Sequence, residues 1–138
     1  MTFRSDVIPA LREAFDDVLA RAGFAWNQGN ATSDQVLVLY EALPADVSAR
    51  VPHIASDLGD LDGPCLDLWI TYDVATDEIA RVTVEAWSLP ELLRHVGRYE
   101  AAADLQAATG FEAQVQACAV AFTALFATPP GPPLPSLP

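Results

Sequence analysis

The sequence predicts an α+β fold, an antiparallel sheet of three to four strands with an N-terminal helix and two C-terminal helices packed on one face. Apolar residues recur at helical spacing near both ends of the chain, and they alternate strictly with polar residues in its middle. A chain of 138 residues is long enough for one apolar core. We therefore expect a single globular domain over residues 1–128. Residues 129–138, six of them proline, are expected to form a polyproline tail outside it.

The first helix is expected to follow Ser5 as its N-cap and to end at Gly23. Its apolar face consists of Leu11, Phe15, Val18, Leu19 and Ala22. A short strand is then expected at 24–26, followed by a turn at 27–30. A second strand is expected at 35–42. Because it is apolar on both sides, we expect it to be covered on both faces.

The stretch from 43 to 64 carries few periodic signals. Pro44 can open a short helix, and Pro52 should interrupt it. Residues 57–64 are rich in Asp and Gly, and they predict a loop.

The clearest elements are two alternating segments, 65–74 and 80–87, which predict a β-hairpin. The core-facing side is expected to carry Leu68, Ile70, Val82 and Val84. The opposite side is expected to carry Asp67, Trp69, Thr71, Asp73, Arg81, Thr83, Glu85 and Trp87.

Charge selects between two registers for this hairpin. Pairing Val74 with Ala80 sets Asp73 opposite Arg81, Thr71 opposite Thr83 and Trp69 opposite Glu85. Sliding the strands by two residues would instead place Asp67 opposite Glu85, a like-charge pair. We therefore expect the first register.

Two capping boxes predict the C-terminal helices. Ser88 with Glu91 starts a helix that should continue to Gly110, and Thr109 with Glu112 starts the next. The apolar face of this last helix consists of Phe111, Val115, Cys118, Phe122, Leu125 and Phe126.

The charge balance excludes some partners. Nineteen acidic side chains face seven basic ones, all arginine, for a net charge of −12 and a pI near 4.2. A field of this sign repels nucleic acid and anionic lipid, and it speeds encounter with basic proteins. We expect no nucleic-acid or membrane partner. The absence of lysine fits a GC-rich coding bias, typical of many bacteria. No apolar run follows the start, which makes the cytoplasm the expected location.

No metal or cofactor is expected. The acidic loop that holds Asp57, Asp60 and Asp62 resembles a calcium loop, but aligning it on Gly63 puts Leu58 at the first ligand position. The chain has two histidines, and they form no zinc-type cluster with the cysteines.

No catalytic residue is assigned from the sequence. It has no G-x-S-x-G turn and no phosphate-binding glycine loop. Cys118 lies among alanines without a basic neighbour, and we interpret Cys65 and Cys118 as buried small apolar residues. A hydrolase with paired carboxylates stays open, because nineteen acids offer many pairs.

The polar side of the hairpin predicts a protein-binding surface, because aromatic residues ringed by acids are typical of an interface centre and rim. Equally, the tryptophans could be covered by 43–64 or by the first helix. The residues expected to bind the partner are Asp67, Trp69, Asp73, Glu85 and Trp87, together with Asp57, Asp60 and Asp62 of the acidic loop.

In size, acidity and this aromatic-acidic face, the chain resembles bacterial immunity proteins and secretion chaperones in general character. The first resemblance implies a non-enzymatic inhibitor that occludes a basic partner protein, for example a toxin. The second implies a homodimer, formed through Ala117, Ala121 and Ala124. A third alternative is a small-molecule-binding or enzymatic domain, with a pocket between sheet and helices. That pocket would use His53, Tyr72 or Trp26.

Overall fold

The computed structural model describes residues 6–55, 58 and 65–127. The helices are α1 (Val7–Arg21), α2 (Pro44–Arg50), α3 (Pro52–Ala55), α4 (Leu89–His95), α5 (Tyr99–Ala107) and α6 (Phe111–Phe126). The strands are β1 (Ala25–Ala31), β2 (Gln35–Ala42), β3 (Leu66–Asp73), β4 (Glu78–Val84) and β5 (Trp87–Ser88).

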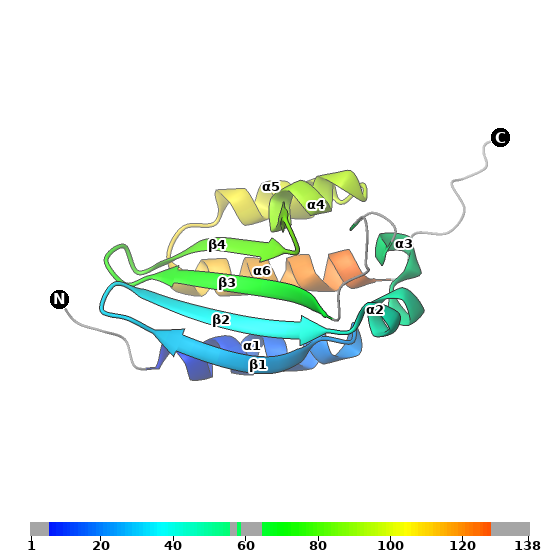
Figure 1. The fold of residues 1–138 in the computed structure, drawn as a ribbon. Helices are drawn as coiled ribbons and strands as arrows, with labels where there is room; N and C mark the ends of the chain where they lie inside the picture. Colours follow the sequence, from blue (N-terminus) through cyan, green and yellow to red (C-terminus); the bar gives the residue numbers. More distant parts are fainter. Residues whose placement is uncertain (1–5, 56–57, 59–64, 128–138) are drawn as a thin grey trace.

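The strands form one antiparallel sheet in the order β1-β2-β3-β4-β5, so each strand pairs with its neighbour in sequence. Helices α1 and α6 pack on one face of this sheet, α4 and α5 lie beside β4, and α2 and α3 lie at one end (Figure 1). The predicted α+β class is confirmed. The structure differs from expectation in having a fifth strand and a third C-terminal helix. Gly97, with φ of 85°, separates α4 from α5.

The expected turn at 27–30 is instead part of β1. The register with β2 shifts between Trp26 and Gln28, so one extra residue is accommodated there. An edge strand tolerates this polar sequence because one side needs no partner. The Trp26 ring anchors the strand, 5.7 Å from the ring of Tyr40 and beneath the guanidinium of Arg12.

The expected hairpin register is wrong. The β3–β4 pairing shifts at Ala80, which has no partner in β3, so Val74 does not pair with it. Beyond this bulge the strands follow the alternative register, and the backbone N–H of Glu85 donates to the Asp67 carbonyl over 2.8 Å. The like-charge pair is tolerated because Glu85 is exposed to solvent, which screens the repulsion.

The two predicted helix starts have different outcomes. Ser88 and Glu91 form the expected capping box at α4. Thr109 does not cap α6, whose N-cap is Gly110, with φ of 87°. The Gly110 N–H donates instead to Glu78 Oε2 over 3.0 Å, which ties α6 to β4. Ser5, expected to cap α1, lies outside the described residues.

The prolines of the 43–64 stretch act as expected: Pro44 opens α2, and α3 begins at Pro52. Of the expected loop 57–64, only Leu58 is described, and it is buried. The proline tail at 129–138 also lies outside the described residues.

The core fills the space between sheet and helices. Phe15 of α1 meets Phe122 of α6 edge-to-face, with ring centroids 5.1 Å apart. Tyr40 of β2 is buried, and its hydroxyl donates to Asp16 Oδ1 over 2.6 Å. Burial and this hydrogen bond raise the Tyr40 pKa. A packed and hydrogen-bonded core holds the other face of the sheet rigid.

Candidate functional site

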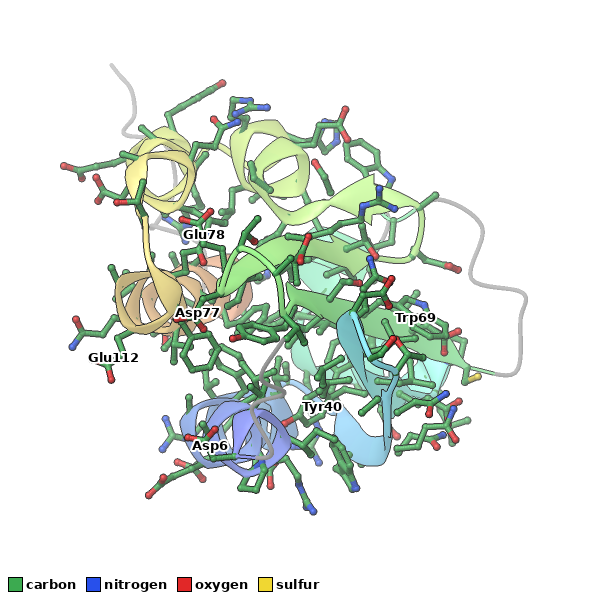
Figure 2. All side chains as sticks on the ribbon, turned by 90° about the vertical axis from the view of Figure 1, so that its left-hand side faces the viewer. Asp6, Tyr40, Trp69, Asp77, Glu78 and Glu112 are labelled. Carbon is green, nitrogen blue, oxygen red and sulfur yellow. The ribbon has the colours of Figure 1, made fainter. Side chains whose placement is uncertain are left out.

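Among the described residues, no helix covers the other face of β1–β4, which is turned toward the viewer in Figure 1. We call this surface the open face. On its three central strands, the side chains that point to it include Gln35, Leu37, Leu39, Glu41, Asp67, Trp69, Thr71, Asp73, Arg81 and Thr83. Figure 2 shows Trp69 on this side of the sheet, and Tyr40 on the opposite side near α1.

The open face has an apolar centre. Leu39 is only 6% exposed although none of the described helices lies over it. It lies directly opposite Trp69 on β3 and Gln28 on β1, so its neighbours on the two adjacent strands flank it. Trp69 itself is half-buried. Trp69 therefore supplies the accessible apolar surface of this patch, and Leu39 adds little to it.

Carboxylates surround this centre. Glu41, Asp67 and Asp73 lie on the open face, and none of them has an ion-pair partner among the described residues. Asp73 also accepts hydrogen bonds from the backbone of the β3–β4 turn, including one of 2.8 Å from Ala75. The basic member of the surface is Arg81, at its β4 edge.

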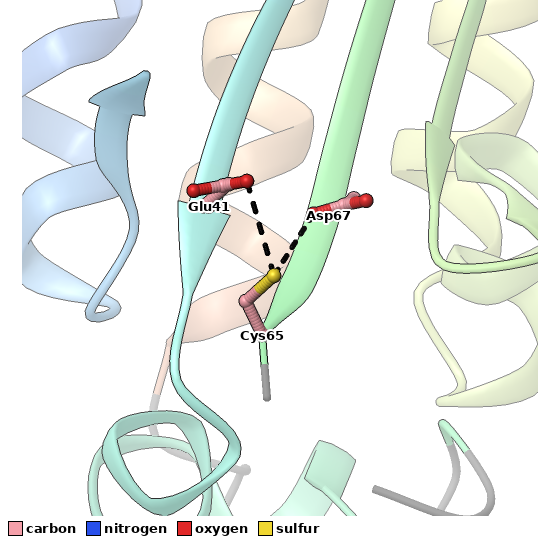
Figure 3. Close-up of side chains that lie close together, drawn as sticks. All are labelled: Glu41, Cys65 and Asp67. Atoms are coloured by element: carbon pink, nitrogen blue, oxygen red, sulfur yellow. Dashed lines mark hydrogen bonds between the residues drawn. The ribbon is translucent and has the colours of Figure 1, made fainter. Parts of the chain in front are cut away.

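Glu41, Cys65 and Asp67 form a cluster at one end of the open face (Figure 3). The Cys65 Sγ lies 3.8 Å from Glu41 Oε1 and 3.7 Å from Asp67 Oδ1. One ligand atom from each residue lies within 4.8 Å of the others, close enough to surround a divalent cation. Sequence reasoning missed this cluster, because Glu41 joins it only through the β2–β3 register.

The chemistry of the cluster argues against a reactive thiol. Desolvation and the negative charges of Asp67 and Glu41 raise the pKa of Cys65. A thiol that stays protonated is a poor nucleophile and a poor metal ligand. Sequence reasoning took Cys65 as buried, whereas it is half-buried at the surface. Beside it lies a cavity of about 440 Å³, also lined by Trp26 and Asp46.

Trp87 does not share a face with Trp69, so this prediction is wrong. Its partner across β4–β5 is Val84, a core residue, and opposed residues point to the same side of a sheet. The Trp87 ring packs 4.7 Å from that of His95 on α4. The cause is a two-residue turn that begins at Glu85, with φ of 58°, and ends β4 early. The expected core side, Leu68, Ile70, Val82 and Val84, is confirmed.

The remaining predicted binding residues are Glu85 and the three aspartates of the acidic loop. Glu85 lies exposed in its turn, beside Asp67. The acidic loop with Asp57, Asp60 and Asp62 lies outside the described residues. Asp67, Trp69 and Asp73 are therefore the predicted residues that one strand brings to one face.

The three residues expected to line a pocket make separate contacts. His53 Nε2 lies 3.3 Å from the Leu125 carbonyl at the end of α6. Tyr72 is buried, and its hydroxyl donates to Asp77 in the β3–β4 turn. Trp26 packs on α1 and Tyr40. A cavity of about 320 Å³ does lie between β4 and the C-terminal helices, but other residues line it.

Comparisons with protein-family models, curated proteins and solved structures find no match to this chain. Within the described ranges, no helix has the length and apolarity needed to cross a bilayer.

Proposed function

We propose that this chain is a non-enzymatic protein-binding domain, and that its open face docks a basic partner protein. The observation that carries the proposal is the exposed side of β2 and β3. There Trp69 and Leu39 form an apolar centre, and Glu41, Asp67 and Asp73 supply negative charge around it. An aromatic anchor inside a polar rim is the usual anatomy of a specific protein interface.

Charge defines the chemistry of the partner. The carboxylates around Trp69 have no ion-pair partners among the described residues, so arginines or lysines of a second protein would complement them. The net charge of −12 would steer such a partner toward the molecule at low salt. An immunity or antitoxin-type inhibitor in a bacterial cytoplasm, which occludes the basic active site of a toxin, is the role that fits this chemistry best.

The test compares two variants that remove the same chemical groups from different surfaces. The open-face variant combines Trp69→Ala with Asp67→Asn and Asp73→Asn. The matched control combines Tyr99→Ala with Glu100→Gln and Asp104→Asn, all on the exposed side of α5. Each variant loses one aromatic ring and two negative charges.

Partners captured by the wild-type chain are identified, purified and titrated against all three proteins. We expect a basic partner whose dissociation constant rises at least about thirtyfold with the open-face variant, because one central aromatic anchor contributes about 2 kcal/mol or more. The control should bind almost as tightly as wild type, and association should slow as salt rises. Equal losses in both variants, or an acidic partner, would contradict the proposal.

A chaperone-like dimer through α6 has less support. Of the three alanines expected at its interface, Ala121 is fully buried in the core. The exposed apolar residue on that helix is Val120. The stripe is therefore interrupted by the packing of α6 on its own domain.

A further inference from the structure

A second surface, separate from the open face, lies along the free edge of β4. The cavity of about 320 Å³ occupies this position, between β4 and the helices α4, α5 and α6. Figure 1 shows α4 and α5 running alongside this edge. Its apolar lining includes Pro90, Leu105, Ala108 and Cys118, and its polar lining includes Arg81, Arg94, Gln106 and Gln114. We call it the β4 cleft.

Two arginines at the β4 cleft lack acidic partners within the described part of the chain. Arg12 and Arg21 on α1 each pair with an Asp four residues away, over 3.1 and 2.7 Å. Arg81 has no such pair, and Arg94 donates instead to the neutral side chain of Gln106 over 2.9 Å. In a chain with nineteen acids, the described lining of this cleft holds two arginines and no acidic residue, which favours an anionic ligand.

The edge of β4 is nearly closed to a further strand. Gln114 both donates to the Ile79 carbonyl and accepts from the Ile79 N–H, over 3.3 and 2.6 Å, so its amide takes the place of a neighbouring peptide group. At the other end, β5 pairs with Thr83 and Val84. Alternate residues of an antiparallel strand direct their backbone groups to opposite edges. Between the Gln114 contact at Ile79 and the β5 pairing at Thr83, Val82 is therefore the residue whose backbone groups face the cleft.

One open position is too little for an extended peptide, which needs several consecutive backbone pairs. The cleft is suited instead to a small ligand that presents one acceptor group to the arginines. Its apolar lining includes Cys118, which burial keeps as a neutral thiol by raising its pKa to about 12. The volume lies at the small end of the range for ligand pockets.

We propose that the β4 cleft binds a small amphipathic monocarboxylate. Its carboxylate contacts the guanidinium groups of Arg81 and Arg94, and its apolar part covers Leu105 and Cys118. Guanidinium groups bind carboxylates through paired, charge-assisted hydrogen bonds, which an alcohol of the same length cannot form. This site is independent of the proposed open-face function. It lies at the edge of β4 that faces away from β3, and it shares only Arg81 with the open face.

Octanoate is the probe, with octan-1-ol as its uncharged analogue. Each is titrated into isotope-labelled full-length protein, and the backbone amide of Val82 and the side-chain amides of Gln106 and Gln114 are followed by NMR. We expect saturable shifts with a dissociation constant of about 1 mM or tighter, and binding of octanol at least about tenfold weaker.

Two variants and a control locate the charge. Arg81→Gln and Arg94→Gln should each weaken octanoate binding about tenfold or more. Arg50→Gln removes an exposed arginine of α2 that does not line the cleft, so it makes the same change in net charge and should leave the affinity unchanged. Trp69→Ala should also leave it unchanged, so the two proposals fail separately.

The proposal is overturned if octanoate at about 10 mM leaves the cleft signals unmoved. It is equally overturned if octanol binds as tightly, or if Arg50→Gln weakens binding as much as Arg94→Gln does.

Discussion

At the scale of single residues, Cys65 shows how neighbouring charges set reactivity. Its thiol contacts the carboxylates of Glu41 and Asp67, and its pKa is raised by desolvation and by both charges. Below that pKa, the fraction of thiolate falls tenfold with each unit of pH. Cys65 should therefore be alkylated by iodoacetamide more slowly at pH 8 than a cysteine in an unstructured peptide. Its rate should also level off only at a higher pH.

The variant Glu41→Gln/Asp67→Asn should raise the alkylation rate several-fold, because it removes both charges and leaves the shape nearly unchanged. Asp46→Asn is the control, an acid that lines the same cavity without a hydrogen bond to the thiol. Mass spectrometry separates this reaction from that of buried Cys118. An unchanged rate in the double variant would show that its carboxylates do not control the thiol.

At the scale of elements, β1 depends on a glycine where a side chain has no room. A Cβ at Gly29 would lie 2.8 Å from Trp26 Cη2 and 2.9 Å from Ile8 Cδ1. Gly29→Ala should therefore destabilise the protein by about 1–3 kcal/mol in urea unfolding, although alanine ordinarily suits a strand better than glycine. Asn30→Ala, at the exposed neighbouring position, should change stability by less than about 0.5 kcal/mol.

A rescue variant isolates the cause. Ile8→Val removes the Cδ1 atom that meets the new Cβ, so it should cost less stability in the Gly29→Ala background than in wild type. Additive losses in this double-mutant cycle, or a Gly29→Ala protein as stable as wild type, would rule out the clash.

The β3–β4 hairpin also shows which parts of an element can be predicted from sequence. Alternation correctly assigned Ile70 and Val82 to the core, because a period of two follows from strand geometry. Neither the bulge at Ala80 nor the turn at Glu85 has a glycine or proline to mark it. The bulge changes the register before Val82, and the turn ends β4 after Val84. The turn is therefore the reason why Trp87 was placed on the wrong face.

At the scale of the whole molecule, the sequence pattern predicts which residues share a strand face, but it does not predict the register between separate strands. Asp67, Trp69 and Asp73 share one strand, so their common face could be predicted. Glu41 joins Cys65 only because β2 pairs with β3 in one register. The β4 cleft depends on Gly97, which breaks the expected long helix so that α4 and α5 can fold over the sheet edge.

The charge of the whole molecule leads to a prediction about stability. With a net charge of −12, the excess acidic side chains repel one another in the folded state. This repulsion acts over about 30 Å at 0.01 M salt but only about 8 Å at 0.15 M. Salt also weakens the attraction within ion pairs. This loss is small, because ion pairs such as Arg21–Asp17 are exposed and contribute little to folding stability. We therefore expect NaCl to raise the melting temperature over this range.

A gain of about 1 kcal/mol would correspond to roughly 3–5 °C for a chain of this size. The combined variant Glu13→Gln/Glu85→Gln/Asp104→Asn removes three exposed charges, from −12 to −9. It should melt higher than wild type at low salt and gain less from added NaCl, because there is less repulsion to screen. KCl should act like NaCl if screening is the cause. A melting temperature that falls as salt rises would mean that the exposed ion pairs outweigh the net repulsion, contrary to this account.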